Sequence, residues 1–498
     1  MARVLLVNPY FFSRIVQHPL NYMDTILSIE KSRIDRFLHE SYVKSDYRML
    51  GIESDFHELP AQSSSLGLLT LASVLSNDGH TVSYYQKDDY ISDSNFIYLV
   101  NNSDIIGITT MNSTWLQAND IVRFSKKANS KIITVIGGPE ATYTSRSPLK
   151  DNPLLDLVCR GEGEEAFIDL AREPNSIENI RSIGCFDFRD GENIVIGKLA
   201  KQVDITSLPP PRYDLINDKK LRVYLQFTRG CASACAFCAE NGKERHKTLE
   251  QIAVELQELE KIRNKSVVFI ADSDFYSSPT KVGDFYAAVK ESKTSNYFAV
   301  QARISDITEQ LESKSIDNHI VFKFLGVENL SDKVLAKVRK GFSWNTIYDK
   351  LRLLRKYYGE VPRYRMNFIQ GLPGEDFNEA QANLERRNKL LEEDLVGPIS
   401  DSVFAPTAKS KIYNNPKQFG LEFDKSSTSI SRADLPVYSY RGEYCRSSLD
   451  VFLHYLSMKQ LYNDHMINKF GLDYVRESTY EQINKTNNGT IAEEIFRW

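Results

Sequence analysis

A chain of 498 residues is too long for one compact core, and its length predicts about two to four domains. The 62 basic and 66 acidic residues nearly balance, so the charge gives no reason to expect a nucleic-acid partner. Apolar runs are too short for a signal peptide or a membrane span, and six cysteines in this length suit a reducing compartment, so we expect a cytoplasmic protein without a membrane span.

Residues 1–200 alternate between short apolar strands and helices. Strands are expected at residues 4–7, 81–85, 105–109, 132–136 and 155–158. A helix is expected at residues 66–75, with Gly79 as its stop signal. Continuous apolar strands between helices predict a doubly wound, Rossmann-like parallel sheet, whose ligand lies beyond the carboxyl ends of the strands. Residues 10–62 interrupt this rhythm as a long insertion, which could be a lid or a packing appendage.

Residues 201–221 are expected to link two domains, because three consecutive prolines at 209–211 favour a stiff, extended chain. The β/α rhythm restarts over residues 222–406. Strands are expected there at residues 223–227, 267–270, 297–300, 320–324, 365–369 and 402–404. The clearest helix covers residues 248–262 and begins with a capping box. Six β/α units predict a partial (βα)6 barrel of the TIM type, followed by a small, mostly helical cap at 407–498.

Three cysteines follow the first strand of the predicted barrel at the spacing C-x3-C-x2-C. Cys231, Cys235 and Cys238 could bind three irons of a [4Fe-4S] cluster and leave the fourth iron open, whereas protein-bound clusters normally have four cysteines. A zinc site that adds His246 is an alternative, although zinc sites usually pair two short clips of ligands.

The other cysteines are Cys159, Cys185 and Cys445, which are far apart in the sequence. We interpret them as small buried hydrophobic residues. A second cluster would need about four thiolates, so the sequence predicts no auxiliary cluster.

The cysteine motif, with Phe237 as its aromatic residue, resembles the signature of the radical S-adenosylmethionine (radical SAM) superfamily. The resemblance implies that SAM binds the open iron through its amino and carboxylate groups. It implies further that one electron from the cluster splits SAM into methionine and a 5′-deoxyadenosyl radical. A one-electron reductant such as flavodoxin or ferredoxin would then be a partner, and the barrel would be the family's core.

Polar motifs follow the second and third predicted barrel strands. Asp272, Ser273 and Asp274 match the position at which the family binds the SAM amino group, although Asp and Ser also cap ordinary loops. Arg303 resembles the family's arginine near the SAM carboxylate or sulfonium, and a structural salt bridge is the alternative.

Three further barrel motifs also match the family. Glu328 lies in Gly-Val-Glu, where the family contacts the ribose or places an interior base, and a buried ion pair is the alternative. Lys340 and Gly341 resemble the Lys-Gly that often follows in the family, or they end a solvated helix. Gly371 and Pro373 belong to a Gly-Leu-Pro-Gly-Glu turn, whose glycines could let the backbone approach adenine.

Residues 1–200 resemble the cobalamin-binding domain that precedes many radical SAM enzymes. The residues that match the expected cobalamin contacts are Thr109, Thr110, Asn112, Gly137, Gly138 and Glu162. The Asp-x-His-x-x-Gly motif that supplies an axial histidine is absent, since His319 lacks the glycine, and the radical SAM branch usually lacks that motif too. A Rossmann-like domain without a cofactor is the alternative, because a fold does not establish a ligand.

The resemblance implies a cobalamin-dependent radical SAM enzyme, whose commonest outcome in the family is methyl transfer from methylcobalamin to an unactivated carbon. A radical enzyme without cobalamin would instead catalyse dehydration, epimerisation, cyclisation or rearrangement. A non-catalytic iron-sulfur protein is the third hypothesis. The substrate is expected to be a small molecule or a peptide, and the sequence does not specify which.

Overall fold

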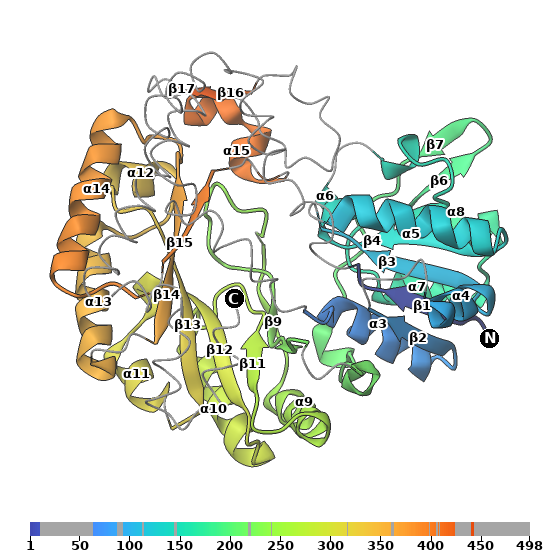
Figure 1. The fold of residues 1–498 in the computed structure, drawn as a ribbon, viewed down its shortest axis with the longest axis horizontal. Helices are drawn as coiled ribbons and strands as arrows, with labels where there is room; N and C mark the ends of the chain where they lie inside the picture. The colour runs from blue at the N-terminus through green and yellow to red at the C-terminus, as the bar shows by residue number, and fades with distance from the viewer. Residues whose placement is uncertain are drawn as a thin grey trace.

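The computed structural model describes residues 1–9, 63–86, 93–111, 114–143, 147–217, 221–240, 242–315, 317–359, 363–397, 399–404, 407, 409–423 and 440–442. The predicted insertion at 10–62 and most of the predicted C-terminal cap lie outside these residues. The described chain forms two α/β domains, each built on its own parallel sheet (Figure 1). We refer to them as the N-terminal domain and the barrel domain. None of the described helices is both long and apolar enough to cross a membrane.

The N-terminal domain contains a seven-stranded sheet in the order β2-β1-β3-β4-β5-β6-β7. Its strands are β1 (Arg3–Val7), β2 (Thr81–Tyr85), β3 (Ile105–Thr109), β4 (Ile133–Gly137), β5 (Leu157–Cys159), β6 (Phe186–Asp190) and β7 (Asn193–Val195). The first five are parallel, as predicted, and β6 and β7 add an antiparallel hairpin that the sequence reading missed. The hairpin begins with Phe-Asp-Phe-Arg-Asp, whose three charged residues interrupt the continuous apolar run by which the other strands were predicted.

Helices cover both faces of this sheet. They are α3 (Leu66–Asn77), α4 (Ser94–Asn101), α5 (Trp115–Ala128), α6 (Pro139–Tyr143), α7 (Glu164–Arg172) and α8 (Ile177–Ile183). Within β1, Leu6 packs into a core with residues of α3 and α7, whereas Leu5 packs into a second core with residues of α4 and α5. Both leucines are fully buried, which stabilises the fold by about 1.5–3 kcal/mol each. The doubly wound architecture is therefore confirmed.

The barrel domain contains six parallel strands in the order β15-β14-β13-β12-β11-β8. They are β8 (Tyr224–Leu225), β11 (Val267–Ile270), β12 (Tyr297–Arg303), β13 (Ile320–Glu328), β14 (Tyr364–Gln370) and β15 (Ile399–Val403). The helices between them are α9 (Leu249–Ile262), α10 (Pro279–Ser292), α11 (Glu309–Ser315), α12 (Asp332–Lys337), α13 (Trp344–Tyr358) and α14 (Phe377–Glu392). The predicted capping box of α9 forms between Thr248 and Gln251. The six strands curve as the predicted partial barrel (Figure 1).

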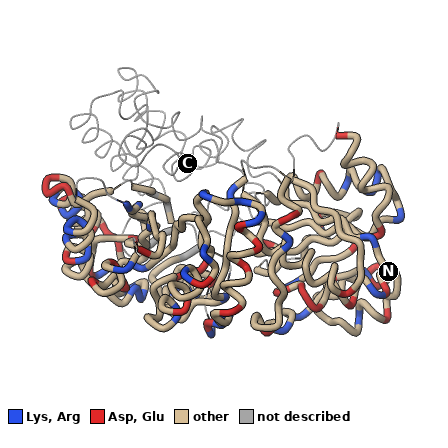
Figure 2. Tube along the Cα trace, turned by 90° about the horizontal axis from the view of Figure 1, so that it is seen from below, with Lys and Arg blue, Asp and Glu red and all other residues tan. Residues whose placement is uncertain are grey.

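Short elements complete the described chain. They are the 3-10 turns Pro148–Lys150, Ile205–Ser207, Tyr213–Leu215, Ile304–Asp306 and Pro416–Phe419, the helix α15 (Lys411–Asn414), and the strand pairs β9 (Thr228–Arg229) with β10 (Arg245–His246) and β16 (Leu421–Phe423) with β17 (Tyr440–Gly442). Along both domains, positive and negative residues are interspersed (Figure 2).

The inner face of the barrel sheet changes character along its strands. Near the amino ends, Val267, Phe269, Ala299 and Phe322 form a small apolar cluster. Two residues beyond Ala299 on the same face of β12, Gln301 is exposed. The interior is thus closed by apolar side chains at one end and open to polar groups at the carboxyl ends of the strands, where chemistry is expected in β/α barrels.

The proline-rich segment is packed against the N-terminal domain. Pro210 accepts a 2.6 Å hydrogen bond at its carbonyl from the hydroxyl of Ser73, and the Arg212 amide donates to the carbonyl of Leu69. Leu69, on α3, also belongs to the main core of the barrel domain. The two domains therefore share apolar packing beside their covalent connection. The predicted boundaries at residues 200 and 222 stay predictions.

Candidate functional site

The three clustered cysteines lie in one loop that connects β9 to β10. These strands pair antiparallel, with Arg229 opposite Arg245, so the two ends of the loop lie side by side. Gly230 begins the loop with φ +90°, and a Cβ there would lie 2.6 Å from the carbonyl oxygen of Lys243. The glycine therefore permits the close approach of the two ends of the loop.

Cys231, Cys235 and Cys238 form no disulfide among the described residues, and their loop is fixed to the rest of the domain. Cys235 is 7% exposed, and Cys231 and Cys238 are partly buried. Between Cys235 and Phe237, the amide of residue 236 donates to the carbonyl of Val338 at 2.9 Å. Burial raises the pKa of the Cys231 and Cys238 thiols, and the negative charges of neighbouring thiolates act in the same direction. Three soft sulfur donors in one loop fit iron, whose binding would favour the thiolate forms.

In the described part of the chain, no three His, Cys, Asp or Glu side chains converge on a point where one metal ion could bind. A [4Fe-4S] cluster does not require the three sulfur atoms to meet at one point, because each cysteine binds a different iron. The imidazole of His246, the fourth ligand of the zinc alternative, is 45% exposed and lies 3.6 Å from Glu244. The donor set of the loop is thus better suited to a cluster.

Asp272 anchors the strand that leads into the cysteine loop. Its Oδ1 accepts hydrogen bonds from the backbone amides of Phe227 at 2.8 Å and Thr228 at 3.0 Å. The residue is 0% exposed, and its second oxygen lies 3.5 Å from Nζ of Lys281. Burial raises the pKa of the Asp272 carboxyl, against the effects of Lys281 and the two amides. These contacts give it a structural role, and the predicted SAM contact stays a prediction.

Asp274 and Ser273 follow at the same strand end but face different surroundings. Ser273 is exposed, whereas Asp274 is buried and accepts a 3.4 Å hydrogen bond from the backbone amide of Arg303. Burial and a hydrogen bond with Asp306 raise the pKa of Asp274 to about 7. Asp274 therefore lies beside a second carboxyl group, that of Asp306, near the end of β12.

Arg303 connects the end of β12 to the cysteine loop. Its Nη1 donates to the hydroxyl of Ser233, which lies between Cys231 and Cys235, and its Nη2 donates to the carbonyl of Lys340. The guanidinium also lies over the ring of Phe342, 5.7 Å from its centroid. Its Nε is buried and has no hydrogen-bond partner among the described residues. A buried donor of this kind fits an anionic ligand, as the carboxylate of SAM would be.

Glu328 and Lys340 form an ion pair at the end of β13. Nζ of Lys340 lies 3.0 Å from Oε1 of Glu328 and 5.8 Å from the ring centroid of Phe237 in the cysteine loop. Glu328 has φ +67°, at a point where the register between β13 and β14 shifts. Such backbone strain in a non-glycine residue is characteristic of functional sites. The ion-pair alternative is what the structure shows, and a ribose contact stays a prediction.

The Gly-Leu-Pro-Gly-Glu turn is held together by its own glutamate. The amide of Gly371 donates to Oε2 of Glu375, whose Oε1 accepts 3.1 Å hydrogen bonds from Asn329 and Asn383. Gly371 and Pro373 are buried. The turn is therefore packed into the domain, and its predicted adenine contact stays a prediction.

The predicted cobalamin residues lie at the carboxyl edge of the N-terminal sheet. Gly138 has φ +93°, and a Cβ there would lie 2.8 Å from Oγ1 of Thr109 and from the carbonyl oxygen of Thr110. Thr110 is 0% exposed, and its hydroxyl donates to the carbonyl of Gly137 at 2.8 Å. The buried Thr110 therefore supports the backbone at this edge, whereas the side chain of Thr109 is partly exposed. Asn112 lies outside the described residues.

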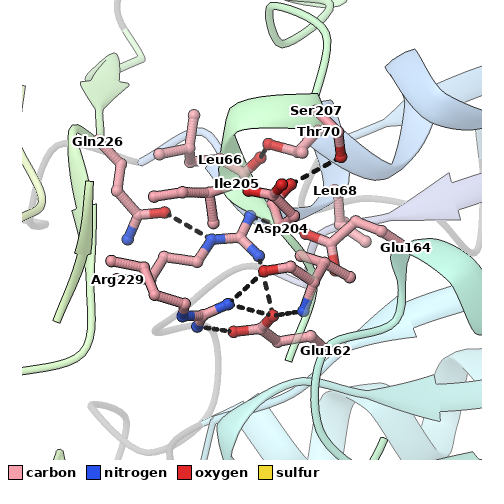
Figure 3. Close-up of polar contacts among 12 residues, drawn as sticks. Leu66, Leu68, Thr70, Glu162, Glu164, Asp204, Ile205, Ser207, Gln226 and Arg229 are labelled. Carbon is pink, nitrogen blue, oxygen red and sulfur yellow. Dashed lines mark hydrogen bonds and ion pairs between the residues drawn. The ribbon is translucent and has the colours of Figure 1, made fainter. Parts of the chain in front are cut away.

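Glu162 is part of an ionic contact between the two domains. Oε2 of Glu162 accepts hydrogen bonds from the Val203 amide at 2.7 Å and from Nη1 of Arg245 at 3.0 Å, and Nη2 of Arg245 contacts Oε1. Glu164, two residues on, lies 2.7 Å from Nη2 of Arg229. Figure 3 shows Gln226, Arg229 and both glutamates converging at this junction. Sequence reasoning missed both arginines, although they flank the cysteine loop, and the cobalamin contact of Glu162 stays a prediction.

Tyr143 brings the edge of the N-terminal sheet to the cysteine loop. It ends α6, which follows Gly138. Burial raises the pKa of Tyr143, and the charges of Glu240, Cys238 and Glu162 contribute. The phenol of the N-terminal domain is therefore near the loop of the barrel domain.

Two family models match this chain, one for each domain. A model described as B12 binding domain matches residues 56–171, and a model described as Radical SAM superfamily matches residues 225–386. The first match includes the edge formed by β3 and β4, and the second includes the cysteine loop and strands β11 to β14.

The chain is also similar to curated proteins. It is 24% identical to an uncharacterized methyltransferase of Pyrococcus horikoshii, over 65% of this chain and 73% of that protein. It is 24% identical to the anaerobic magnesium-protoporphyrin IX monomethyl ester cyclase of Synechocystis, over 59% of this chain. The chain spans 63% of that cyclase, less than two thirds of its length.

Among solved structures, the fold resembles a radical S-adenosylmethionine methyltransferase, TsrM, from Kitasatospora setae, with cobalamin and a [4Fe-4S] cluster bound. The TM-score is 0.63 at 14% identity, and the match covers 93% of this chain and 91% of that one. At this identity the likeness shows a shared fold across both domains.

Proposed function

Because this chain belongs to the radical SAM superfamily, in the branch with a B12-binding domain ahead of the barrel, we propose that it is a cobalamin-dependent enzyme that methylates a carbon atom. The observation that carries the proposal is the loop of three clustered cysteines at the open end of a barrel, whose flanking arginines form ion pairs with the B12-binding domain. The similarity to an uncharacterized methyltransferase supports methyl transfer as the outcome.

Cys231, Cys235 and Cys238 would hold a [4Fe-4S] cluster, and their spacing leaves one iron for SAM. With SAM, the bound cluster supplies a 5′-deoxyadenosyl radical, and bound cobalamin supplies a methyl group. The protein places and shields these groups: Asp272 fixes the strand before the loop, and Arg303 holds Ser233 within it.

The open end of the barrel would bind SAM through groups that the structure leaves available. Ser273 and Gln301 are exposed at neighbouring strand ends, and Nε of Arg303 lacks a partner among the described residues. Asp274, with a pKa raised to about 7 mainly by burial, would be protonated in part near neutral pH and would donate or accept at this edge.

Cobalamin would lie against the carboxyl edge of the N-terminal sheet. Gly137 and Gly138 carry no side chain, so a ligand can approach the backbone at this edge closely. Thr109 offers a partly exposed side chain there. Tyr143, which follows this edge, lies near the cysteine loop, so a substrate bound between the domains would meet both cofactors. We propose a small molecule or a peptide as this substrate, and flavodoxin or ferredoxin as the reductant, in the cytoplasm.

The proposal is tested by anaerobic reconstitution of the full chain with iron and sulfide. We expect 5′-deoxyadenosine to form from SAM and dithionite, and a corrinoid spectrum to appear after incubation with hydroxocobalamin. Cys235→Ala should lose the iron and the SAM cleavage, whereas Cys185→Ala, a matched change at a buried cysteine of the other domain, should retain both. Retention of cluster and activity in Cys235→Ala would contradict the assignment.

Ring formation is the second candidate reaction, favoured by the similarity to anaerobic magnesium-protoporphyrin IX monomethyl ester cyclases. Methyl-deuterated SAM separates the two, since methyl transfer places the label in the product. A product without the label would rule out methylation and leave cyclisation.

A further inference from the structure

The cysteine loop is held at both of its ends by the other domain. Arg229, the last residue of β9, lies two residues before Cys231, and its Nη2 is 2.7 Å from Oε1 of Glu164. Arg245, the first residue of β10, forms two hydrogen bonds with Glu162. We call these four residues, Glu162, Glu164, Arg229 and Arg245, the carboxylate clamp. It joins both strands of the ribbon that carries the loop to one turn of the B12-binding domain.

The clamp is shielded from water. The side chains of Arg229 and Arg245 are 16% and 17% exposed, and that of Glu164 is 8% exposed. Burial alone would raise the pKa of Glu162, but its hydrogen bonds from Arg245 and Val203 and the nearby Arg229 charge lower the net pKa. The carboxylate is therefore ionised across the physiological range, and the ion pairs are stronger than pairs at a solvated surface.

Neighbouring contacts keep the arginines in place. Nε of Arg229 donates to Oε1 of Gln226 at 3.1 Å, and Nη1 of Arg245 donates to the carbonyl of Val203 at 2.6 Å. Fork-shaped guanidinium groups that bond on several sides fix orientation as well as distance. The clamp is consequently a defined joint between the domains (Figure 3).

The turn that carries the glutamates begins at the edge where the B12 ligand is expected. Cys159, the last residue of β5, precedes it, and its Cβ lies 3.7 Å from the Cβ position of Gly137 on β4. Gly163, between the two glutamates, also lies close to Cys159, since a Cβ there would be 3.5 Å from the thiol sulfur. The clamp therefore spans the short path from that edge to the cysteine loop.

We propose that the carboxylate clamp is a positioning device that sets the separation of the cluster-bearing loop from the cobalamin edge. The inference rests on the proposed function, because it assigns the clamp a purpose in a two-cofactor reaction. Methyl transfer needs the substrate carbon to meet the adenosyl radical first and the cobalt-bound methyl group next, so small errors in this separation cost rate.

The test uses the full chain with Glu164→Gln, Arg245→Gln and the double variant. Glu164→Gln removes the ion pair with Arg229 and keeps the side-chain volume. Arg245→Gln removes the ion pair with Glu162 and the hydrogen bond to the carbonyl of Val203, and it shortens the side chain. The 3.7 Å contact between Arg229 and Glu162 remains in both variants. Glu258→Gln is the matched control, because it removes an exposed ion pair with Lys261 that lies wholly within α9. Hydrogen–deuterium exchange of residues 228–246 is measured on the unloaded proteins, with residues 297–300 of β12 as an internal reference.

We expect exchange over residues 228–246 to become about tenfold faster in the double variant, as when a local opening loses a partly buried ion pair, while the β12 reference and Glu258→Gln stay unchanged. In reconstituted protein, the magnetic interaction between the reduced cluster and Co(II) of cobalamin should show a shifted or broadened distance distribution. Iron content and uncoupled SAM cleavage should stay within about twofold, because the clamp touches neither the thiols nor the strand-end groups.

The two readouts separate the possible failures. Unchanged exchange in the double variant would overturn the clamp itself. Faster exchange with an unchanged distance distribution would show a structural contact and overturn the positioning role. A wild-type protein that binds no cobalamin would refute the proposed function, and this is seen without any variant.

Discussion

Replacing Asp272 with alanine tests whether a buried carboxylate holds the strand that leads into the cysteine loop. Its Oδ1 accepts hydrogen bonds from the amides of Phe227 at 2.8 Å and Thr228 at 3.0 Å. Hydrogen bonds to a charged acceptor each contribute about 1.5–3 kcal/mol, so the loss of both predicts a fall of ~3–6 kcal/mol in the free energy of unfolding. The loss of the ion pair with Lys281 adds little, because the ammonium of Lys281 still donates a 2.6 Å hydrogen bond to the carbonyl of Asp274 in the variant.

Two matched variants are expected to lose less free energy of unfolding than Asp272→Ala. Asp272→Asn keeps an oxygen for both amides and removes only the charge that faces Lys281, so we expect a loss of about 1–2 kcal/mol. Ser273→Ala changes the exposed neighbour and should stay within about 0.5 kcal/mol of the wild type. The three variants together separate the backbone anchor from the ion pair.

The assay is urea denaturation of the unloaded full chain, followed by circular dichroism, together with hydrogen exchange of residues 224–229. Exchange is needed because two domains need not unfold in one transition. If Asp272→Ala is as stable as Ser273→Ala and its exchange is unchanged, the anchor role is refuted. A weaker affinity for SAM without faster exchange would instead place Asp272 in SAM binding, as the sequence motif predicts.

Three other predictions concern neighbouring positions. Gly138→Ala should cost about 2–4 kcal/mol by urea denaturation, because its φ is +93° and the new Cβ would meet Thr110 at 2.8 Å, whereas Gly283→Ala on the exposed face of α10 should gain ~0.5–1 kcal/mol. Burial raises the pKa of Asp274 from 3.8 to about 7, so the folded state holds a proton that the unfolded chain releases, and the free energy of unfolding should fall as pH rises between those values. Asp274→Asn should remove that slope in denaturation curves collected across the range, and an unchanged slope would contradict the pKa. Arg303→Lys cannot reach both Ser233 and the carbonyl of Lys340, so uncoupled SAM cleavage should fall about tenfold; full activity would show that the bridge is dispensable.

Local signals in the sequence were enough for the main elements. The apolar run at residues 105–109 and the capping box at Thr248 and Gln251 are encoded within a few residues, and the structure confirms both. The spacing of the three cysteines predicted a shared loop for the same reason. The hairpin of β6 and β7 was missed, because its buried Asp187 pairs with Arg160, and a charged residue reads as exposed until its partner is known.

Contacts between distant residues could be decided only by the tertiary structure. The sequence predicted a cobalamin contact for Glu162, which stays a prediction, and gave no sign that its carboxylate meets Arg245, 83 residues away, when the domains pack together. A buried ion pair was one of the two readings of Glu328, but its partner was not predicted; the structure pairs it with Lys340, which follows α12, beside Phe237. The physical reason is that strand and helix signals depend on neighbours in the chain, whereas the partner of a buried charge depends on how whole elements approach in space.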